Sequence, residues 1–111
     1  MGRLDGKIAL VTGVAGGVGR AAALLFAATG GPHRIRANAI MPGLIRTPAT
    51  EADGLYDTPD SPGFLMGAAN PLGRTGTPED VAKLAVFLAS ADSFYVNATG
   101  IPIDGGQSVI V

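Results

Sequence analysis

The chain has 111 residues, of which 47% are hydrophobic and 15% are charged, and its formal net charge is −1. This length suits one small domain, and the charge balance gives no electrostatic basis for binding nucleic acid. The absence of cysteine excludes disulfides, thiolate metal sites and cysteine nucleophiles, which fits a cytoplasmic protein. No apolar run approaches the roughly 20 residues needed to cross a bilayer, so we expect no membrane partner.

The first predicted element is a strand over residues 8–12 (IALVT), an apolar run typical of a strand covered on both faces. A glycine-rich turn follows, and the helix formers of residues 17–29 predict a mostly buried helix. Backbone N–H groups and the dipole at such a helix start can bind a pyrophosphate. Gly13 would permit the tight turn, Gly17 the approach of a phosphate, and Gly19 close packing of helix on strand. A turn without a ligand is the alternative.

A second strand is predicted over residues 35–41 (IRANAIM), whose side chains alternate between two faces and which ends before a Pro-Gly pair. Arg34 and Arg36 are interpreted as solvated residues at the strand end, with contact to a cofactor 2′-phosphate as the alternative. Residues 42–76 contain many prolines and glycines and no sustained period, which indicates a flap with one short helix over residues 64–69.

The clearest helix signal follows at residues 77–90 (TPEDVAKLAVFLAS), where Thr77 is a good N-cap and Pro78 suits the first helical position. Apolar residues then recur at helical spacing on one face, at Val81, Leu84, Ala85 and Leu88. A short last strand is predicted over residues 99–104. The order of elements predicts an α/β fold of two or three layers, Rossmann-like, with a small parallel sheet of about three strands in chain order.

The spacing of TGVAGGVG, residues 12–19, resembles the nucleotide-binding signature of the short-chain dehydrogenase/reductase family. RIRANAIMPGLIRTP is similar to the family's sixth strand and Pro-Gly turn, and PLGRTGTPEDVAKLAVFLAS and TGIPIDGG resemble its last helix and strand. By this resemblance residues 1–31 match one end of the family's chain and residues 33–111 match the other. The chain is interpreted as one truncated NAD(P)-binding domain.

The resemblance implies that two segments bind NAD or NADP. Around the adenosine and pyrophosphate it places Gly13, Ala15, Gly16, Gly17, Val18 and Gly19, and near the nicotinamide Pro42, Gly43, Ile45 and Thr47. The backbone at Ile45 would fix the carboxamide, and the Thr47 hydroxyl would bond nearby. It also implies a small alcohol or carbonyl substrate and a homo-oligomer formed through the last helix and strand.

Catalysis in this family needs a tyrosine, a lysine four residues later and a serine. Tyr56 and Tyr95 are followed at that spacing by Asp60 and Thr99, so no Tyr-x-x-x-Lys exists, and we predict no catalytic residue. The family's first and sixth strands are not neighbours in the intact sheet, but here one helix joins them and they could pair directly. We therefore expect an impaired oxidoreductase, with a non-catalytic binding or docking module, or a functionless deletion product, as alternatives.

Other polar residues have simpler interpretations. His33 has no Ser, Cys or carboxylate at a suggestive spacing and is interpreted as a solvated loop residue. The flap carboxylates show no metal-ligand spacing, so no metal site is predicted; they are Glu51, Asp53, Asp57 and Asp60.

Overall fold

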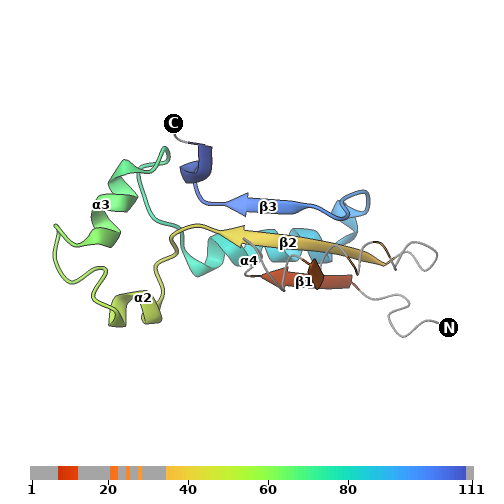
Figure 1. Cartoon of the computed structure of the whole chain (residues 1–111), viewed down its shortest axis with the longest axis horizontal. Coiled ribbons are helices and arrows are strands. Elements are labelled where there is room, and N and C mark those ends of the chain that lie inside the picture. The colour runs from red at the N-terminus through yellow and green to blue at the C-terminus, as the bar shows by residue number, and fades with distance from the viewer. Residues whose placement is uncertain (1–7, 13–20, 23–24, 26–27, 29–34, 110–111) are drawn as a thin grey trace. The chain divides into compact units, whose positions relative to one another are not determined.

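The structure is a computed structural model that describes residues 8–12, 21–22, 25, 28 and 35–109. It forms two compact units, Met1–Met41 with Lys83–Ile101 and Pro42–Ala82 with Pro102–Val111. Figure 1 shows the elements, which are β1 (Ile8–Thr12), β2 (Arg36–Pro42), α2 (Pro48–Ala52), α3 (Pro62–Ala69), α4 (Pro78–Ala89), the 3₁₀ turn η2 (Ala91–Ser93), β3 (Gly100–Ile103) and the 3₁₀ turn η3 (Gln107–Val109).

The strands form a three-stranded sheet in the order β1-β2-β3, and β1 pairs parallel with β2. Backbone hydrogen bonds from Ala98 N to Ala37 O and from Ala39 N to Thr99 O join β2 to the segment leading into β3. The partner numbers rise together along both segments, as they do between parallel strands. The predicted α/β class and strand order are confirmed, as is the direct pairing of the two strands that the sequence joins by one helix.

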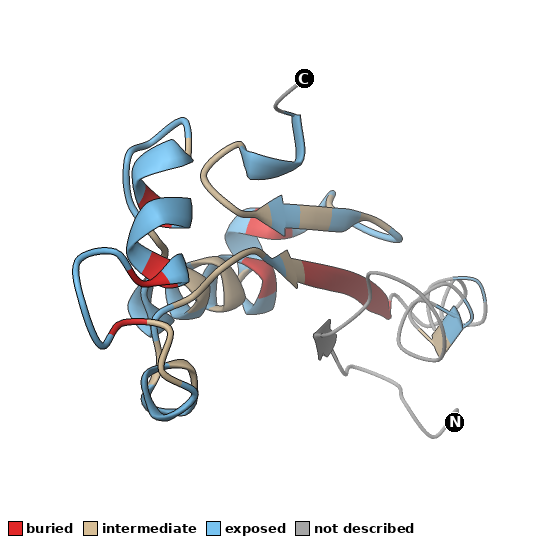
Figure 2. Cartoon of the chain, turned by 60° about the vertical axis from the view of Figure 1, so that its left-hand side comes forward, coloured by how far each residue is buried: buried red, intermediate tan, exposed pale blue. Residues whose placement is uncertain are grey.

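The core of the first unit lies on β2, and Figure 2 shows this strand as the longest buried stretch. Ala37 and Ile40 have no exposed surface, and Leu88 of α4 is only 1% exposed. Val81, Leu84 and Ala85 are half-buried, so the side of α4 predicted from the apolar spacing is the side that packs. The short flap helix is also confirmed, beginning two residues earlier than predicted.

The predicted helix over residues 17–29 falls largely outside the described residues, but positions 21, 22, 25 and 28 are helical. Ala21, Leu25 and Ala28 are exposed, so the prediction of a mostly buried helix is wrong at these positions. They recur at i, i+4 and i+7 and therefore share one face, which is the face open to solvent.

Arg36 is buried, with 9% of its surface exposed. Its guanidinium donates to Leu88 O at 3.1 Å and Ser90 O at 3.4 Å, at the end of α4, and to Val96 O at 3.0 Å. The last carbonyls of a helix have no partner inside it, so they are natural acceptors for a cation. The interpretation of Arg36 as a solvated or phosphate-binding residue is wrong, and Arg34 lies outside the described residues.

Asn38 is also buried and connects β2 to the loop between η2 and β3. Its Nδ2 donates to Val96 O at 3.0 Å, and its Oδ1 accepts from Thr99 N at 3.3 Å. The loop in turn contacts the strand through Asn97, whose Oδ1 accepts from Ala37 N at 3.0 Å. The Asn38 and Asn97 side chains thus form hydrogen bonds with backbone groups that would otherwise lack a partner inside the protein.

Among the described residues no helix is long and apolar enough to span a bilayer, and no group of His, Asp or Glu could hold a metal ion.

We predict that Arg36→Met lowers the free energy of unfolding by about 2–4 kcal/mol, because buried carbonyls lose a charged donor. Urea denaturation measures the change. The free energy of unfolding of Arg36→Lys should lie between those of the parent and of Arg36→Met. An ammonium keeps the charge but lacks the planar fork of donors. A loss below about 0.5 kcal/mol for Arg36→Met, within the range of surface substitutions, would show that these bonds do not stabilise the fold.

Candidate functional site

The candidate site is the turn that follows β2 in the second unit. Gly43 N donates to Ile103 O at 3.0 Å, and a Cβ at position 43 would lie 2.6 Å from Asp104 Cβ. No side chain fits at that distance, so the close approach of the two backbones requires glycine. Pro42 before it is exposed.

Ile45 forms an isolated parallel bridge with Gly76. The bonds of this bridge come from the flanking residues, Arg46 N to Gly76 O and Gly76 N to Leu44 O, both at 2.9 Å. In a parallel bridge the N–H of the central residue points away from the partner strand. The Ile45 N–H is therefore left for another acceptor, and no described residue supplies one.

Thr47 caps the five-residue helix α2 through a reciprocal pair with Thr50. Thr50 N donates to Thr47 Oγ1 at 3.2 Å, and Thr47 N donates to Thr50 Oγ1 at 2.8 Å. Thr50 Oγ1 also lies 3.2 Å from Ile45 O, which it can reach as a donor. The capping box thus fixes the backbone from Ile45 to Thr47.

An aromatic cluster lies beside this turn in the same unit. The Arg46 guanidinium lies over the Tyr56 ring at 4.7 Å and the Phe64 ring at 5.4 Å from each centroid, and its Nε donates to Glu51 Oε1 at 2.7 Å. The two rings meet edge to face at 86°. Tyr56 is buried, and its hydroxyl has no hydrogen-bond partner among the residues that the structure describes. These residues come from separate segments with no common spacing, so no sequence pattern predicts the cluster.

At the start of α4 an ion pair shifts the pKa values of both its partners. Arg74 donates to Asp80 at 2.7 Å, and Thr77 N donates to the same carboxylate at 2.8 Å. The bond from Arg74, followed by those from Thr77, holds the pKa of the Asp80 carboxyl well below its usual range, and Asp80 raises the pKa of Arg74. Acids at a helix start also complement its dipole.

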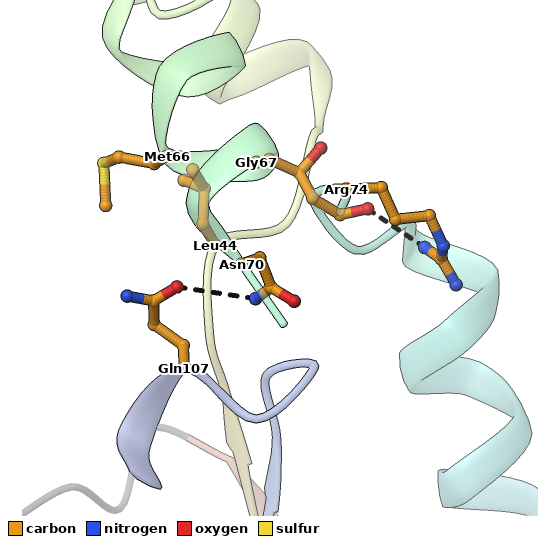
Figure 3. A pocket seen from close by; sticks show the side chains of 7 residues that line it. Leu44, Met66, Gly67, Asn70, Arg74 and Gln107 are labelled. Atoms are coloured by element: carbon orange, nitrogen blue, oxygen red, sulfur yellow. Dashed lines mark hydrogen bonds between the residues drawn. The ribbon is translucent and has the colours of Figure 1, made fainter. Parts of the chain in front are cut away.

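A cavity of about 50 Å³ opens in this unit between Leu44 in the turn after β2, the helix α3 and Gln107 of η3. Figure 3 shows Asn70 and Gln107 facing each other across it; Asn70 Nδ2 donates to Asp104 O at 2.7 Å and lies 3.5 Å from Gln107 Oε1. Gly105 and Gly106 adopt positive φ in the turn after Asp104. Hydrogen bonds from Ser108 and Gly106 lower the pKa of Asp104.

The structure describes one of the two predicted cofactor segments, Pro42, Gly43, Ile45 and Thr47. The other segment, Gly13, Ala15, Gly16, Gly17, Val18 and Gly19, lies outside the described residues, as does His33. The strand before that turn ends at Thr12, which pairs with Ile40 close to the end of β2. In parallel sheets ligands bind beyond the carboxyl ends of the strands. The flap carboxylates Glu51, Asp53, Asp57 and Asp60 are exposed.

The sequence profile of the family described as enoyl-(acyl carrier protein) reductase matches residues 13–108. The oxidoreductase UcpA of Salmonella typhimurium is 34% identical over 129 residues, a match that includes 96% of this chain and 48% of the relative. The chain belongs to the short-chain dehydrogenase/reductase family. It spans about half the length of this relative. L-rhamnose-1-dehydrogenase of Scheffersomyces stipitis is 47% identical over 79 residues, a match that includes 71% of this chain and 30% of the relative.

Solved structures of the short-chain dehydrogenase/reductase family agree. A short-chain type dehydrogenase/reductase from Mycobacterium marinum matches 82% of this chain and 34% of its own, with 36% identity and a TM-score of 0.69. A protein from Agrobacterium tumefaciens assigned as a 2-deoxy-D-gluconate 3-dehydrogenase, with bound NADP, matches 94% of this chain and 46% of its own, with 29% identity and a TM-score of 0.73.

We predict that Tyr56→Phe raises the free energy of unfolding by about 1 kcal/mol, because it removes a buried hydroxyl without a partner. Thermal and urea denaturation measure the effect. Tyr95→Phe is the matched control, since Tyr95 is 99% exposed, and it should change little. A destabilised Tyr56→Phe protein would mean that the hydroxyl has a partner in solution.

We predict that Asp80→Asn destabilises the protein at pH 7 and that the difference from the parent shrinks in acid. The folded pKa of Asp80 is lowered, so its contribution to stability is complete above the unfolded value of about 3.9 and is lost as the pH falls through the folded pKa. Denaturation curves between pH 7 and pH 2 test this, with the exposed Asp60→Asn as control. A difference that does not depend on pH would contradict the assignment.

Proposed function

We propose that the chain binds NAD or NADP, with residues 13–19 at the pyrophosphate and residues 42–47 at the nicotinamide. The observation that carries the proposal is the Ile45 N–H, a backbone donor fixed in direction by the bridge to Gly76 and left without an acceptor among the described residues. A carboxamide oxygen is an acceptor of the right kind for such a group. The NADP bound to one structural relative supports the same ligand class.

The Thr47 hydroxyl supplies a second donor in this proposal. Thr47 Oγ1 accepts from Thr50 N, and a hydroxyl that accepts one bond still has its own proton to donate. Thr50 Oγ1 has backbone carbonyls within reach, at Ile45 O and Thr47 O, so it does not need Thr47 as its acceptor. The capping box can therefore stay intact while the Thr47 proton is given to a ligand.

When bound, the nicotinamide would donate or accept the hydride exchanged with an alcohol or carbonyl compound. The residues of this chain would bind and orient the cofactor, and we place no residue at the proton transfer. Tyr56 and Tyr95 lack a lysine four residues later, so the family's acid–base pair is missing from the 111 residues. Such catalysis is worth about 10² to 10⁴ in rate. This absence favours a dinucleotide-binding module with little or no turnover.

Titration of the purified chain with NADH and NADPH by calorimetry tests the binding proposal, and we expect saturation with a dissociation constant below about 1 mM, which corresponds to roughly −4 kcal/mol. Thr47→Ala and Thr50→Ala both break the capping box, at a cost of about 1 kcal/mol in stability. Thr47→Ala should weaken cofactor binding about tenfold more than Thr50→Ala does, the equivalent of one hydrogen bond. Equal affinity in both variants would remove Thr47 from the site, and no saturable binding would refute the proposal.

Oxidation of NADH and NADPH in the presence of a panel of ketones and aldehydes tests the second part of the proposal. We expect rates at least about 100-fold below those of a complete relative such as UcpA assayed in parallel, because general acid catalysis is absent. A comparable rate would mean that another residue of this chain supplies the proton.

A further inference from the structure

The strand β1 forms one edge of the sheet. In the order β1-β2-β3 it pairs with β2 on one side, and no strand of the described residues lies on its other side (Figure 1). An edge strand leaves a row of backbone N–H and C=O groups without partners in the sheet, and such a row can pair with another extended chain. The hydrogen bonds of β2 decide which groups of β1 form this row.

The outward groups of β1 belong to every second residue. The bonds between β2 and the segment leading into β3 use Ala37 O and Ala39 N, so Asn38 between them faces β1. Leu10 lies opposite Asn38 in the parallel register. When one residue of a parallel pair bonds to the neighbours of the other, the groups of the other point away. The outer edge of β1 therefore presents the N–H and C=O groups of Ile8, Leu10 and Thr12.

The two edges of the sheet differ in their protection. At the β3 edge, the carbonyls of Thr99 and Ile103 accept bonds from β2 and from the residue after it, so the residue between them that faces outward near the strand end is Pro102. Proline has no N–H to offer to a further strand. The sequence of β1, IALVT, has no proline and no charged residue. The β3 edge is thus blocked at Pro102, whereas the β1 edge has no such protection.

We propose that a second copy of this chain pairs with the outer edge of β1, antiparallel and about a two-fold axis at Leu10. In this register Leu10 lies opposite Leu10 of the partner subunit, and Ile8 lies opposite Thr12 of the partner subunit. Opposed residues of this kind exchange both N–H···O bonds. Every outward N–H and C=O group of both strands is therefore used.

The occupant is a second copy because β1 complements itself and the resulting assembly is closed. Like charges directly opposite each other destabilise paired strands, and IALVT has none. A two-fold interface uses the same edge on both copies, so no β1 edge is left to bind a third. The outermost strands of the joined sheet are then the two β3 strands, whose edges are blocked by proline. The assembly is a dimer, and it forms with or without a bound cofactor.

Amide hydrogen exchange of the intact chain tests the pairing without any substitution. The Leu10 N–H should exchange at least about three-fold more slowly at about 1 mM protein than at about 10 μM, by mass action. The Val11 N–H, which faces β2, is the internal control, and its exchange should not depend on concentration. Sedimentation over the same range should show a dimer that dissociates on dilution.

Disulfide cross-linking tests the register, and the absence of native cysteine makes each cross-link unambiguous. Oxidised Leu10→Cys should form a covalent dimer, because opposed Cα atoms lie about 5.5 Å apart, within the range of disulfides. Thr12→Cys alone should not, because the two residues are about 13 Å apart along the strands. A mixture of Thr12→Cys and Ile8→Cys should cross-link. Val86→Cys on α4, at a position 69% exposed, is the control for random collisions.

Other arrangements of the β1 edge give different results. Fast exchange of the Leu10 N–H at every concentration would show an edge left to water. Slow exchange in a protein that sediments as a monomer would show an edge covered by the same chain or by a bound peptide. A dimer that cross-links through Val86→Cys as readily as through Leu10→Cys would use another surface. Each of these results overturns the inference, and the exchange measurement decides it if a cysteine variant does not fold.

Discussion

The first unit depends on one interaction, the burial of the Arg36 guanidinium against the carbonyls that end α4. A cation removed from water is costly unless its donors are paired, and the negative end of a helix dipole provides acceptors of suitable charge. Because Arg36 belongs to β2, these bonds fix where α4 ends relative to the central strand. Asn38 then connects the same strand to Val96 and Thr99, which sets the entry into β3. Two polar side chains thus link three elements that are distant in sequence.

The second unit is organised by close backbone approach. At Gly43 and Gly63 an added Cβ would lie 2.5–2.6 Å from a neighbouring atom, well inside van der Waals contact. Where glycines form the inner surface, the large side chains next to them in sequence must lie outside or at the margin. The turn at Gly43 and the apolar outer face of α3 are therefore two results of the same packing.

The regular elements could be predicted from the sequence, and the tertiary roles of their polar residues could not. The period of Val81, Leu84, Ala85 and Leu88 gives the packed side of α4 directly, because helix geometry alone decides which residues share a face. Arg36 and Asn38 follow the alternation of a half-solvated strand. Their partners lie more than 50 residues away in the chain, so local pattern cannot distinguish carbonyl acceptors from water.

The site shows the same limit. The Pro-Gly turn at Gly43 could be anticipated from the resemblance, but α2 was not predicted. Its five residues have no period to detect, and they are helical because Thr47 and Thr50 cap each other's backbone. The Ile45 N–H, which has no acceptor among the described residues, likewise owes its direction to the bridge with Gly76, a contact between positions 31 residues apart that no short-range pattern encodes.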